Sequence, residues 1–249
     1  MLLHCLAERR QVFGRLLPLL APQLRVAAID LPGFGASPPL PGGGFDLGVV
    51  CERVEAVVGE LGLERPAMLG HSLGGGVAVR YSAERPRALR ALALVAPAGL
   101  IATGAVRPSW RHPRLHALGR TALRAAIPLI AASRALRERA FARVVGDPSA
   151  LDAELARELL LGAALGRSTP AAGIEIVYAG LRDRLAALTL PALVIWGGRD
   201  RVVSPHYGEL LRDALPDGRL LLLPRAGHVP MAEQPAAVAE AIVELLCGG

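Results

Sequence analysis

The sequence predicts an α/β fold: a mostly parallel sheet with helices on both faces and an inserted helical cap. Short apolar runs alternate with longer amphipathic stretches, which is typical of parallel strands buried on both faces. One long segment with a helical pattern interrupts this alternation. The chain has 249 residues, 52% of them hydrophobic, so it is long enough to bury one large core.

Each predicted strand is a short apolar run bounded by turn-forming residues. Strands are expected at about residues 1–5, 25–30, 66–71, 90–96, 192–196 and 219–223. Helical periodicity between these runs predicts helices near residues 11–22, 46–62, 73–85, 205–215 and 235–246. Because strands and helices alternate, the carboxyl ends of the strands are expected at one common edge of the sheet.

The predicted cap comprises residues 98–185, where the alternation stops. Helical patterns run over about residues 113–145 and 150–164. The predicted core therefore consists of two segments, residues 1–97 and 186–249. A helical insertion over a site is a place where lids gate the entry of substrate.

A glycine-flanked serine follows the third predicted strand. The segment reads Gly70-His71-Ser72-Leu73-Gly74-Gly75, between an apolar run and a helical pattern. This is a Gly-x-Ser-x-Gly elbow in strand–turn–helix context, in which the glycines permit a tight turn and leave the serine hydroxyl at the strand end. Ser72 is therefore the candidate nucleophile.

A serine hydroxyl needs a base to activate it, and the base needs an acid to orient it. Asp200 follows the apolar run 192–196, and His228 follows the run 219–223. Both residues are expected on loops at the same edge of the sheet as Ser72. The order serine, aspartate, histidine is the order of an α/β-hydrolase triad and differs from that of chymotrypsin-like and subtilisin-like enzymes.

Together these segments resemble the α/β-hydrolase superfamily, and the elbow is most similar to that of its esterases and lipases. The segment 28–37, Gly197-Gly198-Arg199-Asp200 and Gly227-His228 are similar to family motifs and occur in the family's order. The resemblance implies an oxyanion hole formed by the backbone N–H groups of Leu73 and Leu6.

The first residues depart from the family pattern at one position. His4 matches the histidine of a His-Gly dipeptide, whereas Cys5 stands where the family has glycine. Glycine serves where the backbone adopts a conformation costly for other residues or approaches a neighbour closely, so Cys5 is expected to disturb the oxyanion hole. His4, Cys5 and His71 are expected to line the pocket.

The chain begins inside what corresponds to the family's third strand, so the first two strands are expected to be absent. Three explanations are a misplaced start, a fragment, and a short form whose exposed edge a partner covers; we favour the first. Loss of the second strand would leave residues 25–30 as an open edge. A homodimer is one way to cover that edge.

The predicted reaction is hydrolysis of a small-molecule carboxylic ester through an acyl-enzyme on Ser72, with His228 as base and Asp200 as its orienting acid. Neither a metal nor an organic cofactor is expected. The same triad also serves carbon–carbon bond hydrolases and acyltransferases, which stay open alternatives. A further alternative is a non-catalytic, hydrolase-like binding protein.

The net charge of +6 comes from the predicted insertion. Residues 98–190 contain 13 arginines and 7 acidic residues. This excess could attract acidic substrates or an anionic membrane surface, but a solvated helix face is the simpler interpretation. No nucleic-acid-binding motif accompanies the charge, and no transmembrane segment is predicted.

Three widely spaced cysteines, Cys5, Cys51 and Cys247, fit a reducing compartment, so a cytoplasmic location is expected.

Overall fold

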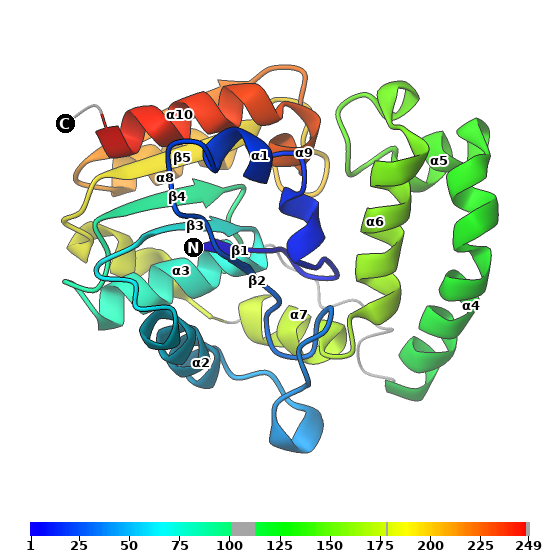
Figure 1. The fold of residues 1–249 in the computed structure, drawn as a ribbon, viewed down its shortest axis with the longest axis horizontal. Coiled ribbons are helices and arrows are strands. Elements are labelled where there is room, and N and C mark those ends of the chain that lie inside the picture. Colours follow the sequence, from blue (N-terminus) through cyan, green and yellow to red (C-terminus); the bar gives the residue numbers. More distant parts are fainter. Residues whose placement is uncertain (101–112, 178, 248–249) are drawn as a thin grey trace.

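The strands form a parallel sheet, as the sequence predicts. The computed structural model describes residues 1–100, 113–177 and 179–247. In this part of the chain six strands pair in the order β2-β1-β3-β4-β5-β6 (Figure 1). They are β1 (Leu2–Leu3), β2 (Ala28–Ile29), β3 (Ala67–His71), β4 (Ala91–Val95), β5 (Ala192–Gly197) and β6 (Gly218–Leu223).

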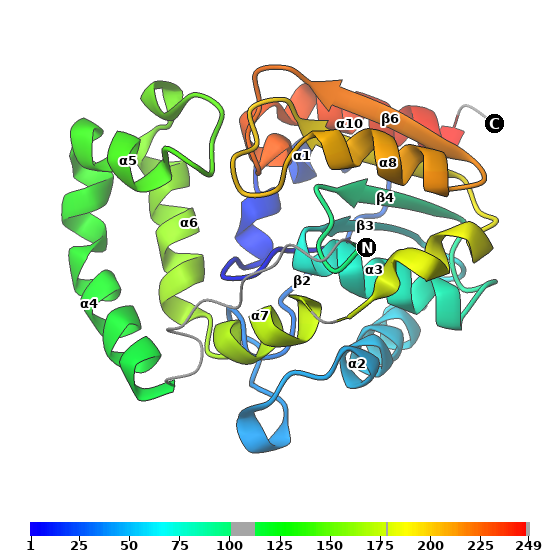
Figure 2. The ribbon, with the colours of Figure 1, turned by 180° about the vertical axis from the view of Figure 1, so that it is seen from behind.

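Helices cover both faces of the sheet (Figures 1 and 2). Those of one face are α1 (Leu17–Leu20), α9 (Pro230–Glu233) and α10 (Pro235–Cys247). Those of the other face are α2 (Leu47–Glu60), α3 (Leu73–Glu84) and α8 (His206–Ala214). The predicted fold class is confirmed.

The residues of β4 show how the sheet creates two cores. Leu92 and Leu94 lie in the core on the side of α2, α3 and α8, whereas Ala93 and Val95 lie in the core on the side of α10. Successive side chains of a strand point to opposite faces, and all of these are buried. The strand is therefore apolar throughout, because neither of its faces meets water.

The elements near the amino terminus are shorter than predicted. The helix expected over residues 11–22 is instead a 3-10 turn, Arg10–Phe13, followed by the single-turn helix α1. Pro18 accounts for the break: it has no N–H to donate and its ring would clash with the carbonyl four residues earlier, so it is tolerated only in a first turn. The expected strands 1–5 and 25–30 are reduced to two residues each, and β2 forms one edge of the sheet.

Within the described residues between β4 and β5 lie the α-helices α4 (Pro113–Ala132), α5 (Arg134–Phe141), α6 (Ala153–Leu165) and α7 (Thr169–Val177). They stand beyond the carboxyl ends of the strands, with α4 outermost and α6 between it and the sheet (Figures 1 and 2). The single helical pattern expected over residues 113–145 divides at Ser133, which caps α5 by accepting a hydrogen bond from the Leu136 N–H. None of the described helices combines the length and the apolar character needed to cross a membrane.

Candidate active site

Ser72 lies at a strained turn between β3 and α3. Its φ is +49° and its ψ is −106°, a conformation that is rare for a residue with a side chain. The turn requires small neighbours, because a Cβ added to Gly70 would lie 2.3 Å from the Gly74 oxygen, and one added to Gly74 would lie 2.3 Å from the Leu3 oxygen. The predicted elbow is therefore present, and its glycines are required by close approach of the backbone.

Asp200 and His228 form a buried pair at the carboxyl ends of β5 and β6. The His228 Nδ1 lies 2.7 Å from the Asp200 Oδ2, and both side chains are almost inaccessible to solvent. The other carboxylate oxygen, Oδ1, accepts hydrogen bonds from the backbone N–H groups of Val202 and Val203 at 2.8 and 2.9 Å. These bonds fix the aspartate, which in turn leaves the Nε2 of His228 directed away from it.

The thiol of Cys5 occupies the space between the elbow and His228. Its Sγ lies 3.9 Å from the His228 Nε2. Burial and the carboxylate of Glu8 raise the pKa of Cys5 well above its usual value, although the Ser72 side chain and the backbone N–H groups of Leu73 and Leu6 oppose this shift. The thiol is thus held neutral, and these three groups lie close enough to influence its pKa.

Cys5, which stands where the family has glycine, affects the site through its side chain and not through its backbone conformation. We expected the backbone at Cys5 to adopt a conformation that favours glycine, but the left-handed residue of this loop is Ala7, with a φ of +60°. Cys5 therefore fits the backbone. Its side chain instead lies near the backbone N–H groups of Leu73 and Leu6, which lower its pKa and are the groups predicted to hold an oxyanion.

Glu8 and His71 form a second buried pair next to His228. The sequence predicted His71 as a pocket-lining residue but gave no sign of Glu8 or of this pairing. The Glu8 Oε2 accepts the Cys5 N–H at 3.0 Å and lies 3.0 Å from the His71 Nδ1, while the His71 Nε2 donates to the His228 carbonyl at 2.7 Å. Burial alone would raise the pKa of Glu8, but His71 and the Cys5 N–H outweigh it and lower that pKa. A connected chain of hydrogen bonds therefore joins the Cys5 loop to the His228 loop.

His4 is fully buried and binds backbone groups on both sides of its ring. Its Nε2 accepts the Leu31 N–H at 3.0 Å, and its Nδ1 lies 2.7 Å from the Cys5 carbonyl, which makes Nδ1 the donor. Burial lowers the pKa of His4 and favours this neutral form. His4 thus ties the loop after β1 to the loop after β2.

The loop that carries His228 is also held by Glu233, a second residue that the sequence pattern did not identify. The Glu233 carboxylate accepts the Gly227 N–H at 2.8 Å and the Gly146 N–H at 2.7 Å, and the His228 N–H donates to the Val144 carbonyl at 2.7 Å. These bonds hold the loop that carries His228 against the segment between α5 and α6. A glutamate in an ordinary helical turn carries no sequence signal for such a role.

The donor atoms of Cys5, His71 and His228 all lie within 4.8 Å of one another, a spacing that a metal ion can use. Both ring nitrogens of His71 are, however, engaged by Glu8 and the His228 carbonyl. Only the Cys5 sulfur and the His228 Nε2 are then left as ligand atoms in this group. The arrangement fits a hydrogen-bonded cluster better than a metal centre.

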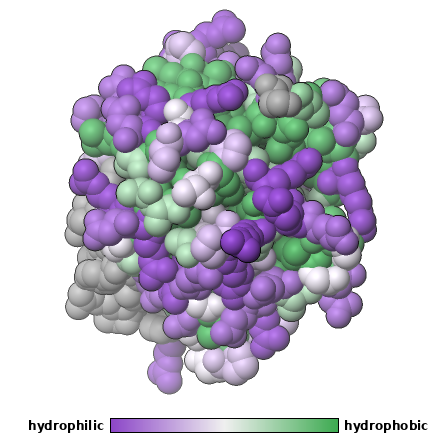
Figure 3. Space-filling view, turned by 90° about the vertical axis from the view of Figure 1, so that its left-hand side faces the viewer, coloured by the Kyte–Doolittle hydropathy of each residue, from purple (hydrophilic) through white to green (hydrophobic). Residues whose placement is uncertain are grey.

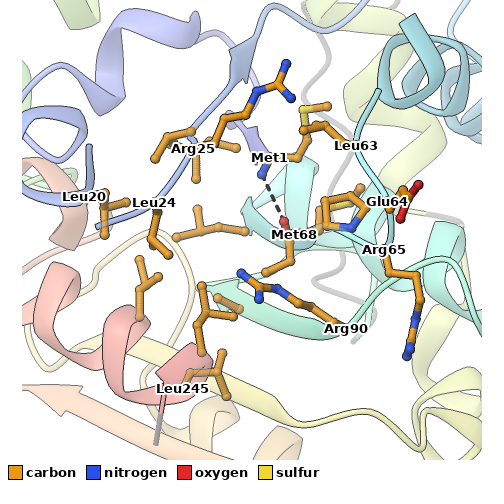
Figure 4. Close-up of a pocket in the computed structure, with 18 of the residues that line it drawn as sticks. Met1, Leu20, Leu24, Arg25, Leu63, Glu64, Arg65, Met68, Arg90 and Leu245 are labelled. Carbon is orange, nitrogen blue, oxygen red and sulfur yellow. Dashed lines mark hydrogen bonds between the residues drawn. The ribbon is translucent and has the colours of Figure 1, made fainter. Parts of the chain in front are cut away.

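A cavity of about 260 Å³ lies at the opposite end of the sheet, near the amino ends of β1 and β3 (Figure 4). Apolar side chains such as Leu24, Met68 and Leu245 line it, with Arg25 and Arg90 at its margin. Figure 3 shows this face of the molecule, where apolar surface gathers in the upper half among charged side chains. The cavity contains none of the triad residues and lies away from the strand ends that carry them.

Comparisons with known proteins agree with this architecture. A family model described as alpha/beta hydrolase fold matches residues 1–235. A pimeloyl-[acyl-carrier protein] methyl ester esterase of Chromobacterium violaceum is 32% identical over 98% of this chain and 92% of its own length. The dihydrolipoyllysine-residue acetyltransferase component of the acetoin cleaving system of Pseudomonas putida is 30% identical over 92% of this chain, which spans 58% of that longer protein. A solved membrane phospholipase A, described as a bacterial virulence factor, has a TM-score of 0.77 and 28% identity, covering 99% of this chain and 77% of that one.

Proposed function

We propose that this chain, which belongs to the α/β-hydrolase family, cleaves carboxylic esters through an acyl-enzyme formed on Ser72. Its similarity to a methyl ester esterase along nearly the whole chain makes it an enzyme of the esterase type. The observation that carries the serine mechanism is the buried Asp200–His228 pair together with the strained Ser72 elbow, both of which meet the Cys5 thiol. The strain is consistent with catalysis, since backbone strain of this kind clusters at active sites.

In the proposed first step, the His228 Nε2 takes the Ser72 proton while the Ser72 oxygen attacks the ester carbonyl. Asp200 holds the imidazole through Nδ1 and stabilises the imidazolium that forms. The proton then passes from Nε2 to the leaving alkoxide, which departs as an alcohol. Water, deprotonated by the same nitrogen, attacks the acyl-enzyme and releases the carboxylic acid and free Ser72.

The backbone N–H groups of Leu73 and Leu6 are the proposed donors to the developing oxyanion. Both of these N–H groups act on the Cys5 thiol, so a substrate carbonyl oxygen would compete with the thiol for them. Rotation about the Cys5 χ1 angle would release them without movement of the backbone. In this proposal Cys5 does not react; it competes with substrate for the hole.

Residues 98–185 are the proposed cap, and residues 1–97 and 186–249 the core. The position of α4 to α7 beyond the carboxyl ends of the strands supports this division (Figure 1). The hydrogen bonds of Glu233 and of the His228 N–H would couple the proposed cap to the base loop. Acyl transfer is a second candidate function, favoured by similarity to a protein named as an acetyltransferase component.

Hydrolysis of p-nitrophenyl esters, from acetyl to long acyl chains, tests the proposal when the chain is compared with Ser72→Ala. We expect ester hydrolysis that falls by at least about 10³-fold in Ser72→Ala, because the nucleophile is lost. The dependence of the hydrolysis rate on acyl chain length measures the size of the acyl pocket. Equal rates in the two proteins, or no turnover by folded protein with any ester, would favour the non-catalytic alternative.

Adding an amine or alcohol acceptor to the same assay separates hydrolysis from acyl transfer. Hydrolysis predicts free carboxylic acid as the main product whether or not an acceptor is present. Product that appears mainly as the acylated acceptor would favour the acyltransferase.

A further inference from the structure

Three leucines form an exposed line along the outer face of α4. Leu115, Leu118 and Leu129 have 60%, 66% and 66% of their surface exposed, although leucine is usually buried. Together with Ala122 and Ala125 they follow the spacing i, i+3, i+7, i+10, i+14, which places all five on one side of a helix. We call these five residues the outer stripe of α4.

The inner face of the same helix is already used. Ile127 is buried in the core cluster that also contains residues of α6 such as Leu155 and Leu159, and Leu123 packs against that cluster. Figure 1 shows α4 as the outermost helix, with α6 between it and the rest of the molecule. The outer stripe is therefore not needed to hold α4 on the fold, and its apolar surface calls for another explanation.

The charged residues of α4 itself are of one sign. The sequence of α4 contains three arginines and no acidic residue. Arg114 and Arg124 are exposed, whereas Arg134 at the start of α5 is exposed but paired with Glu138 at 2.7 Å. An apolar stripe accompanied by arginine is the composition of a helix that lies in the interface of an anionic membrane.

We propose that the outer stripe of α4 docks on an anionic lipid surface, with its leucines among the upper acyl chains and the net positive charge of α4 attracted to the headgroups. A second copy of the chain fits this face less well. A two-fold dimer would bring the same patch of each copy together, and with it arginines opposite arginines without acidic residues of α4 to neutralise them. A lipid headgroup supplies negative charge that the α4 helix of a second copy does not.

Docking in this orientation places the carboxyl ends of the strands, and the Ser72 site, on the membrane side of the molecule (Figures 1 and 2). The inference goes beyond the proposed function and does not depend on it, because binding to lipid is measured without any turnover. An enzyme held in this way would meet amphipathic esters at the bilayer surface.

Sedimentation with unilamellar vesicles tests the proposal. We expect the full chain to bind phosphatidylglycerol vesicles, to bind phosphatidylcholine vesicles more weakly, and to be released as salt rises, because surface charges are screened. The triple variant Leu115→Ser, Leu118→Ser, Leu129→Ser should lose at least about tenfold in its partition coefficient, since three leucines no longer enter the bilayer. Arg114→Gln with Arg124→Gln should reduce the preference for the anionic vesicles.

The matched control is Leu210→Ser with Leu222→Ser, two leucines of α8 and β6 that are 40% and 46% exposed. This variant should bind anionic vesicles as the unmodified chain does, and circular dichroism should show that all the variants are folded. Failure of the unmodified chain to bind anionic vesicles, or equal binding by the triple variant, would overturn the proposal. So would a dimer, measured by analytical ultracentrifugation, that the triple variant alone abolishes.

Discussion

At the scale of single residues, Cys5 is the substitution with the clearest chemical consequence. The thiol lies 3.9 Å from the proposed base and near the groups that would bind an oxyanion. The sequence identified the position because a glycine was expected there. It could not show that the backbone accommodates cysteine, since that depends on where the left-handed residue of the loop falls, which is Ala7.

We predict that Cys5→Gly increases kcat/KM for esters by about fivefold to tenfold. The substrate carbonyl would no longer have to compete with a thiol for hydrogen-bond donors, a cost of about 1 kcal/mol. Steady-state kinetics with the best p-nitrophenyl ester measure the change. Cys51→Ala is the matched control, because Cys51 is also buried and free but packs against α3 in the other core cluster. An unchanged or lower kcat/KM in Cys5→Gly would show that the thiol does not obstruct the site.

At the scale of elements, the proposed site depends on loops that buried carboxylates join to one another. The Glu8–His71 pair connects the loop after β1 to the loop after β6, and Glu233 connects the latter to the segment after α5. Sequence patterns predicted the strands that precede these loops, because a strand buried on both faces is apolar throughout. They did not predict Glu8 or Glu233, because a single buried carboxylate partner depends on contacts between segments that are distant in the chain.

We predict that Glu8→Gln lowers the free energy of unfolding by about 1–3 kcal/mol near pH 7, because a buried charged hydrogen-bonding partner is lost. The pKa of Glu8 is lowered in the folded protein from an ordinary value of 4.5. Its stabilising contribution is therefore complete above pH 4.5 and is lost as the pH falls through the lower, folded pKa. The difference between the two proteins should shrink in that acid range.

Urea denaturation of the unmodified chain and of Glu8→Gln, at a series of pH values from 7 downward, measures this difference. Glu209→Gln is the control, since Glu209 is exposed on α8 and its substitution should have little effect at any pH. A loss of stability in Glu8→Gln that stays constant across the acid range would contradict an ionised Glu8 in the folded protein.

At the scale of the whole molecule, the predicted architecture is confirmed because it rests on repeated, redundant patterns. Six apolar runs at intervals, each followed by an amphipathic stretch or a glycine-rich turn, leave few arrangements besides a parallel sheet covered on both faces. The errors fall where one residue decides the outcome, as with Pro18, which divides the expected first helix, and Ser133, which divides the expected long helix of the insertion.

The exposed stripe of α4 also depends on how the whole molecule packs. The sequence showed the excess of arginine in residues 98–190, but a solvated helix face explained it equally well. Which face of α4 meets solvent depends on how the helix packs against α6, and no local pattern fixes that. Only the packing revealed that the outward face carries leucines.

The central claim, that Ser72 is the nucleophile of a serine hydrolase, is tested most directly by covalent labelling. A fluorophosphonate probe reacts with a serine that a neighbouring base activates, and peptide mapping by mass spectrometry locates the adduct. Our account predicts one adduct, on Ser72, which forms rapidly in the unmodified chain and is absent from Ser72→Ala and from unfolded protein. An adduct at another residue, or no labelling of folded protein, would contradict it.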